Sequence, residues 1–190
     1  MERNRKNTLK PFFKWSGGKR KELPLIKKYI PKEYGCYYEP FIGGGSLWLD
    51  LCPKKSIISD TNEELINFYS VLQEDSKKLI NSINQLSNDY NKRIGEFRKS
   101  LTNLSKEEYK KLFEPVANDF FYKWRDRKNL NRFDKAIKFY LMRQLSFGGM
   151  LRFNKNGDFN VQFGYYKSLK RINCNFDELD NLLKNTKIIF

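Results

Sequence analysis

Three consecutive glycines, Gly43 to Gly45, stand between the aromatic run "CYYEPF" and the apolar run "SLWLDLC". The first run predicts a strand at 36–41, and the second predicts a helix at 46–52. Because glycine lacks a Cβ, such a turn lets a ligand approach backbone N–H groups and the helix N-terminus. The turn is a candidate nucleoside site, although a tight turn without a ligand explains the same residues.

An acidic residue follows at a distance that suits a ribose. "SIIS" at 56–59 predicts a buried strand, and Asp60 closes it, 17 positions after Gly43. In dinucleotide-binding units an acid at the end of the second strand accepts hydrogen bonds from ribose hydroxyls. The glycines here follow F-x-G-G-G rather than G-x-G-x-x-G, so the spacing does not favour a dinucleotide. A helix-capping Asp60 is the simpler alternative.

A second glycine pair lies near the N-terminus. In "FFKWSGGKR", at 12–20, a tryptophan precedes two glycines and Lys19, which leaves backbone exposed beside an aromatic ring and a cation. The start of a helix with a packed tryptophan explains the same pattern. The apolar spacing of "GGKRKELPLIKKYIP" predicts that this helix covers 17–31.

The segment "LSFGGMLRFNKNGDFNVQFGYYK", at 145–167, interleaves basic residues with aromatic residues. Its turn signal "NKNGDF" predicts a β-hairpin at about 148–167. Cations beside aromatic rings hold phosphates and disturb base stacking in nucleic-acid complexes. An ordinary amphipathic hairpin whose aromatics form core is the alternative. Arg152 and Asn154, two positions apart, are expected on the same face of the hairpin.

The composition narrows the class of protein. The 190 residues include 37 Lys+Arg and 22 Asp+Glu, a net charge of +15, which favours a polyanionic partner such as nucleic acid. The absence of histidine excludes histidine-based triads and histidine metal ligands. The three cysteines form neither a zinc pattern nor a disulfide framework, so we expect no metal site and a reducing, cytoplasmic setting. No signal peptide or membrane-spanning run is recognisable.

The order of elements predicts an α/β protein with an inserted helical block. Residues 1–65 read as strand, glycine turn, helix, strand and acid, which is the outline of a Rossmann-like unit. Residues 66–172 have helical periodicity and end in the hairpin, and 173–190 return to a short helix and a β-branched strand. Asn62 and Ser105 are expected helix caps.

In this order, "KWSGGK", "EPFIGGGS", "SDTNEEL" and "FGGMLRFNKNGDFNVQFGYYK" closely resemble the Dam-like, or D12 class, DNA adenine-N6 methyltransferases. The resemblance covers about residue 11 to 190. It implies a Rossmann-like core that uses S-adenosylmethionine, with an inserted helical target-recognition domain carrying a β-hairpin. The implied activity is site-specific methylation of adenine in double-stranded DNA, at a GATC-like target. The resemblance also implies a monomer, and members of the same family serve in restriction–modification systems.

The resemblance also assigns roles to individual residues. It implies that the cofactor is contacted by Trp15, Lys19, Glu39, Phe41, Gly43, Gly45 and Asp60. It implies that DNA is contacted by Lys14, Phe147, Met150, Arg152, Asn154, Tyr166 and Lys167. Arg152 is the expected base reader, since a guanidinium bonds guanine bidentately, and Phe147 is the expected wedge between bases.

Three departures from the family matter. Several relatives that read GATC have Asn-Gly in place of Gly148-Gly149, and an arginine in place of Tyr165, whose loss removes a phosphate contact. The family's catalytic Asp-Pro-Pro-Tyr motif is also missing, because the sequence contains no Pro-Pro pair. We therefore expect no catalytic residues in this chain. It is interpreted as a truncated or split N-terminal portion, inactive alone, that works with a companion C-terminal polypeptide.

Two alternatives stay open. One is a catalytically inactive DNA- or cofactor-binding module that is complete as it stands. The other is a different Rossmann-type nucleotide enzyme, such as a dehydrogenase. The glycine spacing and the charge of +15 argue against the dehydrogenase.

Overall fold

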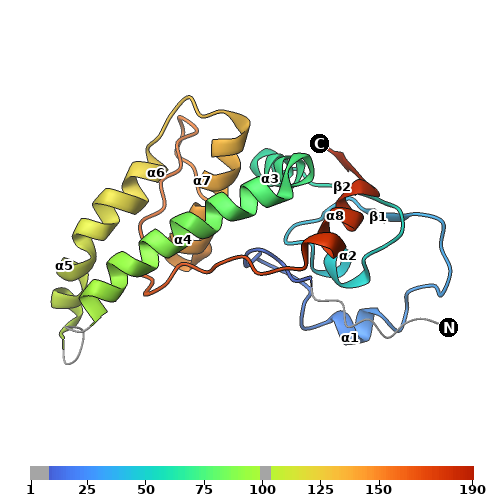
Figure 1. Cartoon of the computed structure of the whole chain (residues 1–190), viewed down its shortest axis with the longest axis horizontal. Coiled ribbons are helices and arrows are strands. Elements are labelled where there is room, and N and C mark those ends of the chain that lie inside the picture. The colour runs from blue at the N-terminus through green and yellow to red at the C-terminus, as the bar shows by residue number, and fades with distance from the viewer. Residues whose placement is uncertain (1–8, 99–103) are drawn as a thin grey trace. The chain divides into compact units, whose positions relative to one another are not determined.

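A computed structural model describes residues 9–98 and 104–190 (Figure 1). The described residues form two compact units. Residues 9–77 and 173–190 make up the first, which we call the sheet unit, and residues 78–172 make up the second, the helical unit. Among the described helices, none has the length and apolar character needed to cross a bilayer.

The sheet unit contains a small parallel sheet with the strand order β1-β2-β3. Its strands are β1 (Tyr37–Glu39), β2 (Ser56–Ser59) and β3 (Thr186–Ile189). The helix α2 (Ser46–Leu51) connects β1 to β2, as parallel neighbours require a crossover rather than a tight turn. Helices combined with a parallel sheet confirm the α/β class expected from the sequence.

Three further helices belong to the sheet unit: α1 (Leu23–Ile26), α3 (Glu63–Glu74) and α8 (Phe176–Lys184). Helix α3 begins where the sequence predicts, because the side chain of Asn62 accepts a hydrogen bond of 2.8 Å from the Leu65 N–H. Asn175 caps α8 in the same way.

The helix predicted at 17–31 is wrong in extent. Only the four residues of α1 are helical, and none of them is buried. Pro24 sits in the first turn, where it lacks an N–H and its ring disfavours any preceding helical turn. Leu23, Ile26 and Ile30, which share the predicted apolar face, are only partly buried, so little packing supports a longer helix.

The core of the sheet unit is built around α2 and α3. Trp48 and Tyr69 are fully buried, with ring centroids 5.7 Å apart and planes nearly perpendicular. Phe13 packs edge-on against Phe68 at 5.2 Å. Since α3 packs into this core, the unit ends after Lys77, whereas the sequence placed the boundary after residue 65.

The helical unit is built from helices and helical turns. These are α4 (Ser76–Arg98, which begins in the sheet unit), α5 (Lys106–Val116), the π-helical turn η1 (Ala117–Tyr122), α6 (Lys123–Arg125), α7 (Arg132–Leu145) and the 3-10 turn η2 (Phe147–Gly149). The predicted cap of α5 is present as a reciprocal capping box between Ser105 and Glu108.

Two asparagines on α4 hold an extended segment of the helical unit. The Asn91 amide donates to the Leu169 carbonyl and accepts from the Leu169 N–H, at 3.0 and 2.9 Å. Asn84 forms the same pair of bonds with Ile172, at 2.9 and 2.8 Å. The main-chain N–H and carbonyl groups of Leu169 and Ile172 are thus bonded by side chains and not by a neighbouring strand.

The predicted hairpin at 148–167 is an antiparallel loop with two isolated bridges, not a pair of regular strands. Phe153 pairs with Phe159, and Ser146 pairs with Phe163. Phe159, Val161 and Phe163 alternate into the core, as the period of two requires. The aromatics on this side are therefore core residues, while the other side faces solvent.

A buried chain of hydroxyls ties α2, β2 and β3 together. The Trp48 Nε1–H donates to Ser56 Oγ at 3.1 Å, and Ser56 Oγ lies 2.7 Å from Thr186 Oγ1. Thr186 Oγ1 donates to the Leu182 carbonyl at 2.7 Å. Because that bond uses the Thr186 proton, Ser56 must donate to Thr186 while it accepts from Trp48.

We predict that Ser56→Ala lowers the free energy of unfolding by about 1–3 kcal/mol, since it leaves the buried indole N–H and the Thr186 hydroxyl short of a partner. Urea denaturation followed by tryptophan fluorescence measures the change. Ser59→Ala is the matched control, because Ser59 is only partly buried, and it should change stability by about 0.5 kcal/mol or less. Equal effects of the two substitutions would contradict the role of the hydroxyl chain.

Candidate functional site

Asp60 closes the glycine turn. Its Oδ2 accepts a 2.9 Å hydrogen bond from the Gly43 N–H, and its Oδ1 accepts a 3.0 Å bond from the Asn62 N–H. The half-buried carboxylate thereby joins the turn after β1 to the start of α3. A carboxylate has about four acceptor positions, so Asp60 retains capacity for the hydroxyl groups of a ligand.

The space beside the glycines is filled by the protein's own side chains. A Cβ on Gly43 would lie 2.7 Å from Cδ1 and Nε1 of Trp15, and a Cβ on Gly45 would lie 2.9 Å from the Tyr69 hydroxyl. Both glycines also have left-handed backbone angles, with φ of +48° and +66°. The sequence suggested that an approaching ligand excludes side chains here, but Trp15 and Tyr69 already exclude them.

Tyr69 is a site residue that the sequence did not reveal. Its buried hydroxyl donates to the Gly43 carbonyl at 3.0 Å. Burial raises the pKa of this phenol, so it remains a donor at neutral pH. Tyr69 lies on the apolar face of α3, where a sequence pattern gives it no feature that separates it from a core residue.

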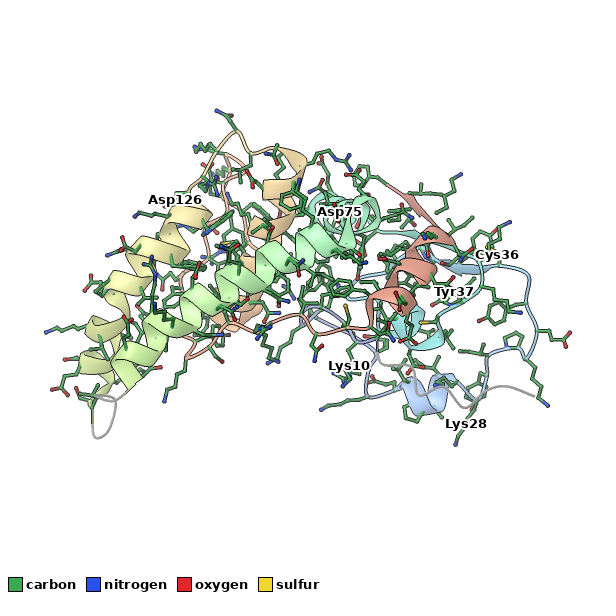
Figure 2. All side chains as sticks on the ribbon, viewed as in Figure 1. Lys10, Lys28, Cys36, Tyr37, Asp75 and Asp126 are labelled. Atoms are coloured by element: carbon green, nitrogen blue, oxygen red, sulfur yellow. The ribbon has the colours of Figure 1, made fainter. Side chains whose placement is uncertain are left out.

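Glu39 is committed to bonds inside the sheet unit. Its Oε2 accepts a 2.6 Å hydrogen bond from the hydroxyl of Tyr37, a residue of β1 that is labelled in Figure 2. The carboxylate also accepts a hydrogen bond from the main-chain N–H of Trp48 in α2. Burial raises the pKa of Glu39, while these two bonds act in the opposite direction. Glu39 thus fixes the end of β1 to the first turn of α2.

The structure gathers some of the expected cofactor residues and leaves others exposed. Trp15, Gly43, Gly45 and Asp60 meet at the glycine turn. The Phe41 side chain is 75% exposed. Lys19 is also exposed, and its ammonium donates to the Gly17 carbonyl at 2.7 Å, within its own loop.

In the helical unit, Arg152 is exposed and braced by a neighbour that the sequence did not reveal. Its Nε–H donates to Asn160 Oδ1 at 3.0 Å, and Nη2 lies 3.5 Å from the Asn160 carbonyl. These contacts use one side of the guanidinium and orient it. A polar residue opposite Arg152 in the predicted hairpin was the available signal for Asn160.

Asn154 shapes the tip of the loop. Its Oδ1 accepts from the N–H groups of Asn156 and Asp158, both at 2.9 Å. Gly157, with a φ of +78°, completes the turn. The side-chain oxygen of Asn154 is thus used within the turn, and its contact with DNA stays a prediction.

Two large apolar side chains project from the turn at the start of the loop. Phe147 is 63% exposed and Met150 is 45% exposed. Between them lie Gly148 and Gly149, with φ of +63° and +62°. Exposed apolar side chains next to an exposed arginine are typical of surfaces that meet nucleic-acid bases.

The other expected DNA contacts are exposed residues. Tyr166 and Lys167 lie near the end of the loop, and the Lys167 ammonium is 5.4 Å from the centre of the Tyr109 ring. Tyr165, at the position of the missing arginine, has the Lys110 ammonium 6.0 Å from its ring. Lys14 is exposed in the sheet unit.

Residues 15–190 match the family model described as D12 class N6 adenine-specific DNA methyltransferase. The chain belongs to this family. It is 35% identical over 196 residues to the Type II methyltransferase M.MjaIII of Methanocaldococcus jannaschii, an alignment that covers 95% of this chain and 61% of that protein. It is 32% identical over 191 residues to the Type II methyltransferase M1.LlaDCHI of Lactococcus lactis subsp. cremoris, covering 99% and 59%.

The DNA adenine methylase of Escherichia coli strain K12 is 30% identical over 171 residues, covering 88% of this chain and 50% of that protein. The D12 class chain therefore spans between half and about three fifths of the length of these relatives.

We predict that Gly43→Ala displaces Trp15 and lowers the free energy of unfolding by about 1–3 kcal/mol, because the new Cβ meets the indole and the residue needs a left-handed backbone. Urea denaturation and the tryptophan emission spectrum report the two effects. Gly35→Ala is the control, since an added Cβ there has no heavy atom within 4 Å. A Gly43→Ala variant as stable as the control would contradict the crowding.

Proposed function

We propose that this chain is the cofactor- and DNA-binding portion of a site-specific DNA adenine-N6 methyltransferase. The observation that carries the proposal is the meeting of Trp15, Gly43 and Asp60, which come from three separate segments. Membership of the D12 class supports the reaction, and the net charge of +15 supports a DNA substrate.

The residues of the glycine turn fit S-adenosylmethionine, which supplies an electrophilic methyl group when bound. In this proposal the remaining acceptor positions of Asp60 take the ribose hydroxyls, and the half-exposed Trp15 offers an apolar surface. Lys19 and Phe41 complete the contacts from exposed positions, and Glu39 acts indirectly through α2. The sheet unit would then be part of a Rossmann-like core.

The helical unit is proposed as the target-recognition domain. Arg152, already oriented by Asn160, would read a guanine through its remaining N–H groups. Phe147 and Met150 would enter between bases. Contacts to the DNA backbone and flanking bases are assigned to Lys14, Asn154, Tyr166 and Lys167. A GATC-like target is part of this proposal.

Methyl transfer to adenine needs more than these two sites. The base must leave the duplex, and its amino nitrogen is a poor nucleophile because its lone pair is delocalised into the ring. The 190 residues contain no Asp-Pro-Pro-Tyr to accept the amino hydrogens and stack on the base. Methyl transfer therefore needs these groups in addition to the cofactor site and the DNA site of this chain. Among the described strands, β1 and β3 each pair with β2 alone, so the outer edge of either strand can accept a further strand.

We predict that Asp60→Asn weakens S-adenosylmethionine binding by tenfold or more, roughly the effect of losing charge-assisted hydrogen bonds to hydroxyls. Isothermal titration calorimetry on the 190-residue chain measures the dissociation constant. Asp50→Asn removes the same charge from α2 and should bind the cofactor as the wild type does. An equal loss in both variants, or no binding by the wild type, would refute the assigned site.

We predict that Arg152→Ala reduces discrimination between a GATC duplex and a permuted duplex by about 1–3 kcal/mol, because a bidentate guanine contact is lost. Fluorescence anisotropy at fixed salt gives both affinities. Lys155→Ala, which removes a charge from an exposed site three residues away, should weaken both duplexes alike. If Arg152→Ala also weakens both equally, Arg152 contacts phosphate and does not read a base.

A further inference from the structure

We propose that Arg143 is a positioning residue that holds the Phe147–Met150 turn in the shape that presents its two apolar side chains. That this turn contacts DNA rests on the proposed function. That Arg143 stabilises the turn rests on contacts within the helical unit.

Arg143 is a buried charge on the last turn of α7. Its residue surface is only 8% exposed, and its neighbours Leu141, Met142 and Leu145 are buried apolar residues. Desolvating a guanidinium is unfavourable unless hydrogen bonds replace the lost water. The Nη1–H of Arg143 donates to the carbonyl of Gly149. A methionine or leucine would fill this place without the desolvation penalty. Hydrogen bonding by the guanidinium, including this bond to Gly149, is what an arginine adds.

The turn that receives this bond has a conformation that needs support. Gly148 and Gly149 are consecutive left-handed residues, and glycine is the residue with the largest choice of alternative conformations. The Gly149 N–H donates to the Ser146 carbonyl at 2.8 Å. A Cβ on Gly149 would lie 3.0 Å from the main-chain carbonyl oxygen of Arg143. The peptide of Gly149 is therefore packed against the end of α7 and bonded to the Arg143 side chain.

Main-chain hydrogen bonds also hold this turn, and within it the Met150 N–H donates to the Phe147 carbonyl at 3.3 Å. The Phe147 N–H donates to the Gln162 carbonyl at 2.9 Å, and the Gly164 N–H donates to the Leu145 carbonyl at 2.7 Å. Arg143 supplies a side-chain bond at Gly149, between Phe147 and Met150. A turn fixed before binding avoids the conformational entropy that a mobile glycine pair would lose on contact with DNA.

Hydrogen–deuterium exchange tests the hold itself. Arg143→Met should speed exchange of the Gly149 and Met150 amides at least about fivefold, while Arg143→Lys, which can still donate to the Gly149 carbonyl, should restore part of the protection. Lys135→Met is the control, because it removes a charge from an exposed site on the same helix. Unchanged exchange in Arg143→Met, or equal acceleration across the whole helical unit, would overturn the proposal.

A double-mutant cycle tests the consequence for DNA. Arg143→Met and Phe147→Ala should each weaken duplex binding about tenfold, and the loss in the double variant should be clearly smaller than the product of the two losses, because both changes remove the Phe147 contact. Fully additive losses would mean that Arg143 acts by another route and would overturn the link. If Phe147→Ala binds as the wild type does while the exchange result holds, the proposed DNA role of Phe147 fails and the positioning role of Arg143 stands.

Discussion

No Cβ fits at Gly43 or Gly45, because neighbouring side chains fill the space beside both residues. The indole of Trp15 approaches them from the N-terminal segment, and the hydroxyl of Tyr69 approaches from α3. Once these two side chains are in place, the turn can adopt one path, and the Gly43 N–H meets Asp60. Side-chain packing by Trp15 and Tyr69 thus helps to shape the candidate cofactor site.

In the helical unit, residues 165–172 form an irregular segment that is not part of a strand. Side chains therefore supply hydrogen bonds that a neighbouring strand would otherwise supply. Three tyrosines donate their hydroxyls to carbonyls of that segment: Tyr90 to Tyr166 at 2.5 Å, Tyr109 to Tyr165 at 3.2 Å and Tyr140 to Lys170 at 2.9 Å. Burial raises the pKa of each phenol, which keeps the donating proton in place. The rings of Tyr90 and Tyr140 belong to the core, and the hydroxyls of all three tyrosines take the place of strand partners.

Local chemistry made some features predictable. Asn62 and Ser105 were recognisable as caps because capping depends on residues three positions apart, and the acid after "SIIS" was recognisable by its place at a strand end. The prediction of a helix at 17–31 was wrong in extent because the apolar spacing was given more weight than Pro24. The spacing alone also could not show that the apolar face is only partly buried.

Features that depend on contacts between distant residues were not predictable. Tyr69 contacts a carbonyl 26 positions away, and its neighbours on α3 have the same apolar pattern. Asn160 gains its role only when the loop brings it against Arg152. Arg143 was not predicted either, although its charge stands within the apolar run "FYLMRQL", and charged residues are rarely buried without a partner.

Asn84 and Asn91 can both bond the segment 169–172 because the distance between them along α4 matches the length of that segment. Seven residues of helix rise roughly 10 Å, and three residues of extended chain cover about the same distance, so two turns of α4 match the step from Leu169 to Ile172. Each side-chain amide donates and accepts one hydrogen bond as a peptide group of a neighbouring strand would. One side of α4 therefore provides the bonds that a strand would provide. An insertion between 169 and 172 would break this match, whereas a change of length after 172 would leave it intact. The main chain at Ile172 is therefore fixed to α4 at the point where the helical unit ends.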